Sequence, residues 1–250
     1  MSVPRVLVVR SGANPFARLD VGSGVELVER SSHTIVPVAV PASALSGPAD
    51  LVIFTSQVAV ERVLGDASLA AAVRSAAAGT GSRVVAVGDA TAAALSRRGL
   101  PPQVVAGGSA EAILASLPRH LDGASALVPC GDDGAVEIDE ALRSRGARVE
   151  RVVVYRKVPQ PADKDLSEEI ERSPFAAFCA TSPSAARWLF ASVSGSAAQK
   201  LRATPAVVLG RFTRRYLESH GVEHIAVADE PRFDAAARLL ERLATGAPEQ

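Results

Sequence analysis

The chain has few cysteines and no long uncharged hydrophobic run. Its 250 residues include two cysteines. Cys130 and Cys179 lie in apolar, strand-like segments, which predicts buried reduced thiols rather than a disulfide framework. No run approaches the roughly 18 uncharged residues of a membrane span, and no basic segment followed by an apolar stretch precedes the first strand-like run. We therefore expect a soluble, cytoplasmic protein with no membrane association.

Lysine is scarce, although the charges balance. Lysine and arginine together number 27, as do aspartate and glutamate, so the formal net charge is zero. This balance argues against a nucleic-acid-binding protein that relies on a strongly positive surface. Only three of the 27 basic residues are lysines, which leaves 24 arginines. Arginine's planar fork suits carboxylate recognition, although a GC-rich genome would explain most of the excess.

Motifs for metals, nucleotides and redox chemistry are also lacking. His220 and His224 have the four-residue spacing of a helical metal pair, but Gly221 interrupts the helix between them and no third ligand is near. The chain contains no Cys-x-x-Cys pair, no P-loop and no G-x-G-x-x-G motif. The acidic turn at 131–134 lacks the remaining ligands of a calcium loop. We therefore expect no metal and no dissociable cofactor.

An internal repeat is the most informative feature that is present. Three segments of the first half return in the same order in the second half, which predicts two copies of one unit. Similar lobes on one chain enclose a cleft, and such clefts are favoured ligand sites. The segments RVLVVRSG, LVIFTSQVAVERVL and VVAVGDATAAALSRRGL return as ALVPCGDDG, AAFCATSPSAARWLF and AVVLGRFTRRYLESHGV.

Short β-branched runs alternate with helical stretches, which predicts parallel α/β domains. Ser56 and Ser182 are natural N-caps, and Pro183 suits the first helical position. The helix after Gly88 should stop at Gly99. We also expect a helix over 13–30, although two glycines interrupt its pattern. Strands are expected at about 5–10, 34–40, 50–55, 83–87, 102–106, 125–129, 148–158, 175–180, 205–209 and 223–228.

Two proline-bearing segments, 34–41 and 152–161, occupy equivalent positions in the repeat. Their prolines disfavour helices and central strands, so we interpret the segments as connectors or edge strands. If both cross between lobes, one lobe is discontinuous. The expected domains are then 1–37 with 160–250, and 42–155, with 38–41 and 156–159 as linker strands.

The order and spacing of its motifs make the sequence resemble the uroporphyrinogen-III synthase family over nearly the whole chain. The motifs that carry the resemblance are VLVVR, LVIFTS, VVAVG, LRSRGARVERVVVYRKVP, TSPSAARWL and VVLGRFT. It implies two flavodoxin-like α/β lobes, from a duplicated unit, joined by a two-stranded linker. It also implies an enzyme, a cyclising hydro-lyase of tetrapyrrole and haem biosynthesis, whose substrate is the linear tetrapyrrole hydroxymethylbilane. The last pyrrole ring is inverted, and water is lost.

The resemblance also implies site residues. Tyr155 matches the tyrosine of the family's VYR motif and is the expected catalytic group, since loss of the hydroxyl needs a proton donor or polar anchor. Thr213 and Arg10 match substrate-binding positions, and Ser56 and Ser182 match the family's serines. Backbone N–H groups at the helix starts after Ser56, Gly88, Ser182 and Gly210 suit the eight carboxylates of the substrate.

Each of these residues also has a structural interpretation. Tyr155 is then a packed strand tyrosine, Ser56, Ser182 and Thr213 are caps, and Arg10 is a solvated strand end. Tyr216 is assigned to packing. The sequence also departs from the family's usual pattern at three positions, which are Cys130, Ala135 and Phe212, while Asp132 and Asp133 place acid where an anion is expected.

Those departures leave other functions open. One is a non-catalytic two-lobed protein that binds a polyanionic tetrapyrrole or a similar ligand, and another is a synthase domain detached from a larger tetrapyrrole enzyme or a regulator. In every case we expect a monomer with a small-molecule ligand and no nucleic-acid partner.

Overall fold

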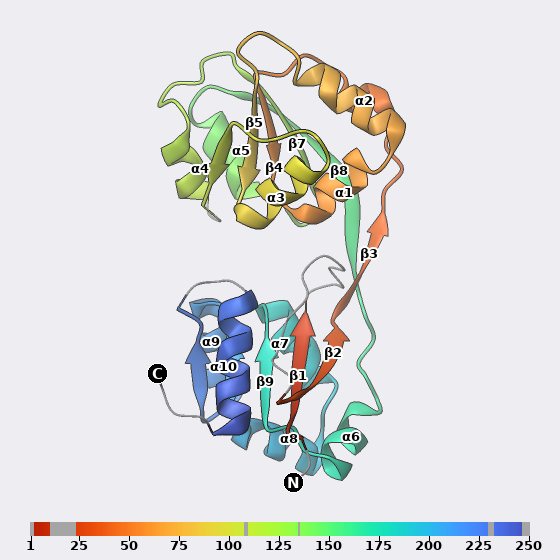
Figure 1. Cartoon of the computed structure of the whole chain (residues 1–250), viewed down its shortest axis with the longest axis vertical. Coiled ribbons are helices and arrows are strands. Elements are labelled where there is room, and N and C mark those ends of the chain that lie inside the picture. The colour runs from red at the N-terminus through yellow and green to blue at the C-terminus, as the bar shows by residue number, and fades with distance from the viewer. Residues whose placement is uncertain (1–2, 11–23, 108–109, 135, 230–232, 247–250) are drawn as a thin grey trace. The chain divides into compact units, whose positions relative to one another are not determined.

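The computed structural model describes residues 3–10, 24–107, 110–134, 136–229 and 233–246. The chain divides into two compact units (Figure 1). Unit 1 combines Met1–Thr34 with Val158–Gln250, and unit 2 is the continuous segment Ile35–Lys157. Unit 1 is therefore built from both ends of the chain.

Unit 1 contains a five-stranded sheet in the order β11-β10-β9-β1-β2, and every neighbouring pair is parallel. Val6, Leu7, Val8 and Val9 of β1 are fully buried, as expected for a parallel strand covered on both faces. The strands are β1 (Arg5–Arg10), β2 (Glu26–Ser31), β9 (Ala177–Ala180), β10 (Ala206–Val208) and β11 (Ile225–Val227).

Alternate residues of β1 enter two different cores. Leu7 and Val9 pack with residues of α6 (Leu166–Arg172), α7 (Pro183–Ala191), α8 (Gly195–Ala203) and α9 (Arg211–Ser219). Val6 and Val8 pack against α10 (Phe233–Thr245). The two-residue period of a strand thus divides the core of unit 1 between the faces of its sheet.

Unit 2 contains a six-stranded sheet in the order β3-β8-β7-β4-β5-β6. Helices α1 (Gln57–Leu64), α2 (Ala67–Ala76) and α3 (Asp89–Arg97) pack on one face, with the 3₁₀ turn Ala42–Leu45. Helices α4 (Ala110–Ser116) and α5 (Val136–Arg143) pack on the other. The strands are β3 (His33–Pro37), β4 (Leu51–Phe54), β5 (Arg83–Val87), β6 (Val104–Ala106), β7 (Ser125–Gly131) and β8 (Arg148–Pro159).

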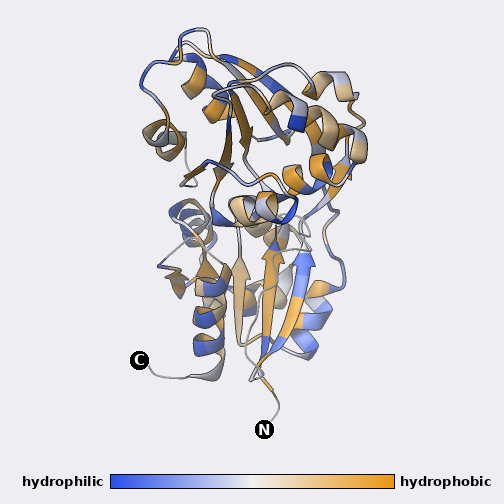
Figure 2. Ribbon diagram, turned by 45° about the horizontal axis from the view of Figure 1, so that its top comes forward, coloured by the Kyte–Doolittle hydropathy of each residue, from blue (hydrophilic) through white to orange (hydrophobic). Residues whose placement is uncertain are grey.

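The hydropathy of the ribbon follows this layering. Most strands of the two sheets are mainly orange, whereas several helices carry both orange and blue residues (Figure 2). Buried strands such as β4 and β9 are continuously hydrophobic, whereas the edge strand β2 contains the exposed Glu26 and Glu29.

The two proline-bearing connectors pair with each other. β3 and β8 are neighbours in the six-stranded sheet, and the Val38 backbone N–H donates to the Val154 carbonyl at 3.1 Å. The chain passes between the units after Thr34 and again before Val158. Both passages therefore fall within β3 and β8.

Each of the ten expected strand segments overlaps an observed strand. The helix expected over 13–30 is wrong in its described part, because residues 26–31 form β2. β2 pairs with β1 along six residues, from Arg5 with Glu26 to Arg10 with Ser31. The hydrogen bonds that complete one side of the buried strand β1 outweigh the local helical pattern. Residues 11–23 lie outside the described residues.

Candidate functional site

Tyr155 and Ser56, two predicted site residues, lie side by side in unit 2. The Tyr155 hydroxyl is 3.2 Å from Ser56 Oγ, and only 4% of Tyr155 is exposed. Ser56 is also the N-cap of α1, where its Oγ accepts the Ala59 backbone N–H at 3.1 Å. One serine therefore starts the helix and contacts the tyrosine.

Burial favours the protonated form of the Tyr155 phenol. Burial raises the pKa of Tyr155, an effect that the hydrogen bond to Ser56 and the positive charge of Lys157 only partly oppose. At neutral pH the side chain is a phenol and can donate a hydrogen bond or a proton.

The acidic turn that follows β7 is fastened to the strand that carries Tyr155. Asp132 N–H donates to the Tyr155 carbonyl at 3.2 Å, and Asp132 Oδ1 accepts the Lys157 backbone N–H at 3.2 Å. The Lys157 ammonium is 3.0 Å from Asp133 Oδ2. Asp132 and Asp133 thus both have partners on β8, and the Lys157 ammonium partly offsets their negative charge.

Cys130 lies just before this turn. It is fully buried, and burial raises the pKa of its thiol, although the nearby Arg151 guanidinium acts in the opposite direction. Arg151 also donates to the Gly134 carbonyl at 2.6 Å. Ala135, another position at which the sequence departs from the family's usual pattern, lies outside the described residues.

In unit 1, Arg10 is the last residue of β1, and Ser182 follows the neighbouring parallel strand β9. The interpretation of Arg10 as a solvated strand end is wrong, because 6% of the residue is exposed and its guanidinium forms an ion pair with Glu29. The guanidinium also lies 5.2 Å from the centre of the Phe233 ring. Ser182 caps α7, where its Oγ accepts the Ala185 backbone N–H at 3.1 Å.

Gly210 and Thr213 lie at the start of α9. Gly210 is the N-cap, and Thr213, of which 3% is exposed, lies three residues later. The interpretation of Thr213 as the cap is therefore wrong. Phe212 is 62% exposed, and the Arg211 guanidinium lies 5.1 Å from the centre of its ring.

Gly88 completes the predicted set as the N-cap of α3, with a φ of +82°. The four expected helix starts divide equally between the units. Within each unit they follow adjacent parallel strands, β4 and β5 in unit 2 and β9 and β10 in unit 1. Each pair of helix N-termini therefore lies at the carboxyl edge of its sheet, the usual position of ligands in open α/β sheets.

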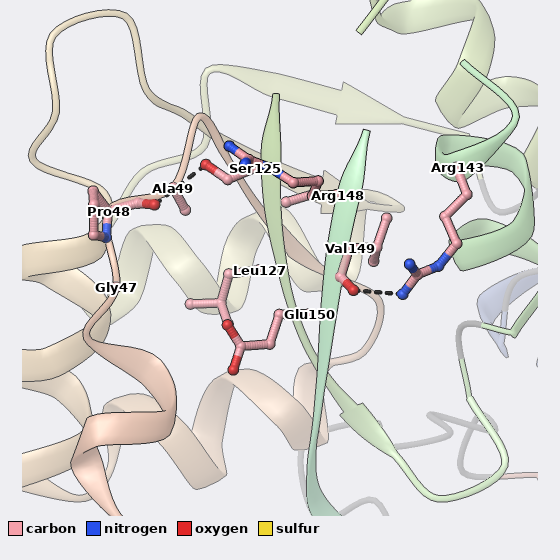
Figure 3. A pocket seen from close by; sticks show the side chains of 10 residues that line it. Gly47, Pro48, Ala49, Ser125, Leu127, Arg143, Arg148, Val149 and Glu150 are labelled. Carbon is pink, nitrogen blue, oxygen red and sulfur yellow. Dashed lines mark hydrogen bonds between the residues drawn. The ribbon is translucent and has the colours of Figure 1, made fainter. Parts of the chain in front are cut away.

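A pocket of about 290 Å³ in unit 2 lies elsewhere (Figure 3). It opens at the amino ends of β7 and β8, beside Ser125, Arg148 and the segment 47–49. None of the predicted site residues lines it. Its Arg143 guanidinium donates to the Val149 carbonyl, and its Ser125 hydroxyl to the Pro48 carbonyl (Figure 3).

Tyr216 and His220 take structural roles. Tyr216 packs against the core of unit 1 and stacks on His220, with 4.0 Å between ring centres, as its assignment to packing predicted. Gly221, with a φ of +78°, follows the end of α9 and precedes His224. In the part of the chain that the structure describes, no cluster of three or more His, Cys, Asp or Glu side chains is suited to a metal ion. Within the same residues, no helix has the length and apolar character needed to cross a bilayer.

Sequence reasoning missed two groups around Tyr155, namely Gly131 and Lys157. Lys157 lies two residues beyond Tyr155 on the same strand, so its spacing was a usable signal. The contact of Gly131 with Tyr155 joins two strands and has no local signal.

The fold and these residues define a parallel α/β protein that places its candidate polar groups at the carboxyl ends of its strands. The sequence model of the family described as uroporphyrinogen-III synthase HemD matches residues 16–238. The chain therefore belongs to the uroporphyrinogen-III synthase family, and its activity is that of this family of tetrapyrrole-forming enzymes.

Solved structures of the same family share the fold. A mutant uroporphyrinogen III synthase of Thermus thermophilus is 23% identical with a TM-score of 0.65, and the match covers 97% of this chain and 99% of that one. The Helicobacter pylori enzyme is 17% identical with a TM-score of 0.60, over 94% and 97% of the two chains. No curated protein sequence matches the chain significantly.

Proposed function

We propose that the chain forms uroporphyrinogen III from hydroxymethylbilane mainly by positioning, with Tyr155 assisting the departure of the hydroxyl. The observation that carries this proposal is the buried, protonated Tyr155 phenol held at 3.2 Å from Ser56. A phenol that stays protonated at neutral pH can donate to the leaving oxygen, as general acid catalysis requires.

The proposed step balances without a cofactor. The carbon–oxygen bond of the hydroxymethyl arm breaks with its electron pair on oxygen, which takes the Tyr155 proton and leaves as water. The freed methylene carbon bonds to the substituted α-carbon of the last pyrrole ring. The bond from that α-carbon to the preceding methylene bridge then breaks, and the bridge bonds to the other, unsubstituted α-carbon, which inverts the ring. The proton lost from this second α-carbon as the ring regains aromaticity returns to the phenolate. The remaining task is to hold the geometry that gives the inverted ring.

Helix N-termini are the proposed binding groups for the substrate carboxylates. The amides that follow Ser56 and Gly88 in unit 2, and Ser182 and Gly210 in unit 1, offer positive dipole ends without lysine side chains. Arg10 is proposed to add a cation and Thr213 a hydroxyl. This supply of backbone donors reconciles a polyanionic substrate with a protein of zero net charge.

We also propose that both units are flavodoxin-like lobes from one duplicated unit. Counted in chain order, the strands of unit 1 have the spatial order 2-1-3-4-5, which is the flavodoxin-like order. Unit 2 has the same order for β8-β7-β4-β5-β6 when β7 and β8 are counted first. Exchange of the first two strands between two copies explains both orders.

The proposed lobes are 1–37 with 160–250, and 42–155, with 38–41 and 156–159 as linker strands. The division after Thr34 and before Val158 supports these limits. We further propose a cytoplasmic monomer without a nucleic-acid partner, and the zero net charge supports the last of these three points. Sedimentation equilibrium at micromolar concentration tests the monomer.

Product analysis tests the activity. Freshly prepared hydroxymethylbilane closes spontaneously to the type I isomer, so the enzyme should be detected by the type III isomer. Tyr155→Phe should reduce the rate of type III formation about tenfold or more, while the retained ring keeps the packing. Tyr216→Phe, which removes the chain's other tyrosine hydroxyl, is the control and should remain active.

Each failure has a distinct meaning. Binding of the substrate with only type I product would identify a non-catalytic tetrapyrrole-binding protein. If Tyr155→Phe formed the type III isomer at the wild-type rate, Tyr155 would have only a structural role. Positioning of the substrate by backbone amides would then account for the reaction.

A further inference from the structure

Strand β8 contains one extra residue immediately before Tyr155. β7 and β8 pair residue by residue from Ser125 with Arg148 to Cys130 with Val153, and the next pair is Gly131 with Tyr155. Val154 is therefore left without a partner on β7. This is the geometry of a β-bulge, a feature that redirects side chains and is common beside active sites.

The bulge changes the face on which Tyr155 lies. Val152 and Val154 pack in the core on the side of α1, whereas Val149 packs in the opposite core. Strict alternation would place Tyr155 on the same face as Val149. Tyr155 instead packs beside Val154 on the side of α1, whose N-cap is Ser56. The extra residue thus directs the phenol toward Ser56.

Gly131 leaves the space that the redirected ring occupies. A Cβ atom at Gly131 would lie 2.7 Å from both Cε2 and Cζ of Tyr155 and 2.9 Å from its hydroxyl oxygen. Real Cβ atoms essentially never approach so closely, so any other residue there displaces the ring. The backbone at Gly131 does not have a positive φ, so its conformation does not require glycine. The close approach of the Tyr155 ring does require it.

Asp132 fastens the turn to the backbone of β8 at Tyr155 and at Lys157. Its backbone N–H donates to the carbonyl of Tyr155, and its Oδ1 accepts the N–H of Lys157. These two bonds replace the regular ladder beyond the bulge. They hold Gly131 against the phenol.

We infer that Gly131 and Asp132 are positioning residues that, with the bulge at Val154, hold the Tyr155 hydroxyl beside Ser56 for the reaction. This inference rests on the proposed function, in which Tyr155 is the catalytic group. Neither residue needs to touch the substrate, because each acts through the tyrosine.

Gly131→Ala is the direct test, and Gly134→Ala in the same turn is its matched control. A Cβ at Gly134 would have no neighbour closer than 3.5 Å, which is ordinary contact. Gly131→Ala should lower the kcat for type III formation about tenfold or more with little change in KM. Gly134→Ala should preserve both constants and the isomer ratio.

Titration of the phenol gives a readout that does not depend on activity. The chain has two tyrosines, so in a Tyr216→Phe background the ultraviolet titration reports Tyr155 alone. Gly131→Ala should lower the apparent pKa of Tyr155 toward its ordinary value, since displacement exposes the ring to water. Unchanged titration and unchanged kcat in Gly131→Ala would overturn the inference.

Asp132 provides a second test that adds no atoms to the core. Asp132→Ala removes the acceptor for Lys157 N–H and should lower kcat and the apparent pKa of Tyr155. Asp132→Asn retains an Oδ1 acceptor and should rescue both. Equal behaviour of the two variants would refute the fastening role of this side chain. Full activity of Tyr155→Phe, by contrast, would refute the catalytic proposal, while a titration shift in Gly131→Ala would still establish that Gly131 holds the ring.

Discussion

Replacement of the two capping serines by alanine separates helix capping from the hydrogen bond to Tyr155. Ser56 and Ser182 cap α1 and α7 in the same way, each accepting an N–H three residues later at 3.1 Å. Ser56 also contacts the buried Tyr155 hydroxyl, whereas Ser182 also lies 2.9 Å from the Ser184 hydroxyl. Ser182→Ala is therefore the matched control for Ser56→Ala.

The expected costs follow from these partners. Loss of a serine N-cap costs about 1 kcal/mol of unfolding free energy. A buried hydroxyl left without a partner costs about 1–3 kcal/mol more. Ser182→Ala should therefore cost about 1 kcal/mol, and Ser56→Ala about 2–4 kcal/mol. In a Tyr155→Phe background the additional cost of Ser56→Ala should disappear.

Urea unfolding followed by circular dichroism measures these free energies, and the single tryptophan, Trp188 in α7, reports unit 1 by fluorescence. Ser182→Ala should shift the Trp188 transition, whereas Ser56→Ala should mainly affect the remaining dichroism signal. Equal costs for the two serines, or additivity of Ser56→Ala with Tyr155→Phe, would refute the reasoning that the hydrogen bond to Tyr155 stabilises unit 2.

Four further outcomes are expected. Gly88→Ala should lower the free energy of unfolding in urea by about 1–3 kcal/mol, because alanine is strained at the φ of +82° found at Gly88. Gly210→Ala is the control and should cost much less, since its φ of −173° is extended. Equal costs for the two variants would contradict backbone strain at Gly88. Burial raises the pKa of Cys179 from 9.0 to about 12, so its stabilising contribution is complete below pH 9 and is lost as the pH rises through 12. Unfolding free energies should show this loss, and a thiol reagent should modify Cys179 only on unfolding; rapid labelling of the native protein would be evidence against it. Arg10→Ala should chiefly raise KM for hydroxymethylbilane, and an unchanged KM would exclude carboxylate binding there. Thr213→Val should raise KM more weakly, an effect that steady-state kinetics at several substrate concentrations measures.

Much of the fold could be predicted because its signals are local. Buried parallel strands such as β4 and β9 are short continuous apolar runs, and the helices that follow them begin at the N-caps Ser56 and Ser182. β2 was missed because Glu26 is exposed, Leu27 and Val28 are only half-buried, and the strand is specified by its pairing with β1. An edge strand of this kind is determined by a partner that its own sequence does not show.

The candidate site was predictable only in part for a related reason. Ser56 and Ser182 could be recognised as caps from local sequence, and Tyr155 from the family motif. The alternation of β8 alone gives the wrong face for Tyr155, because the bulge depends on its register with β7. The burial of Arg10 follows from its ion pair with Glu29, 19 residues away, which no local pattern indicates.

The passage of the chain out of unit 1 and back has a consequence for synthesis on the ribosome. β1 is made first, but its neighbour β9 follows much later, since Val6 pairs with Ala177 and 177 − 6 = 171 residues separate them. At about 5–20 residues per second, this interval lasts roughly 10–30 seconds. Unit 2 is continuous and is complete before β9 emerges, whereas the hydrophobic strand RVLVVR lacks one of its two partners throughout. The N-terminal strand is thus the part of the nascent chain most exposed to aggregation and to capture by chaperones.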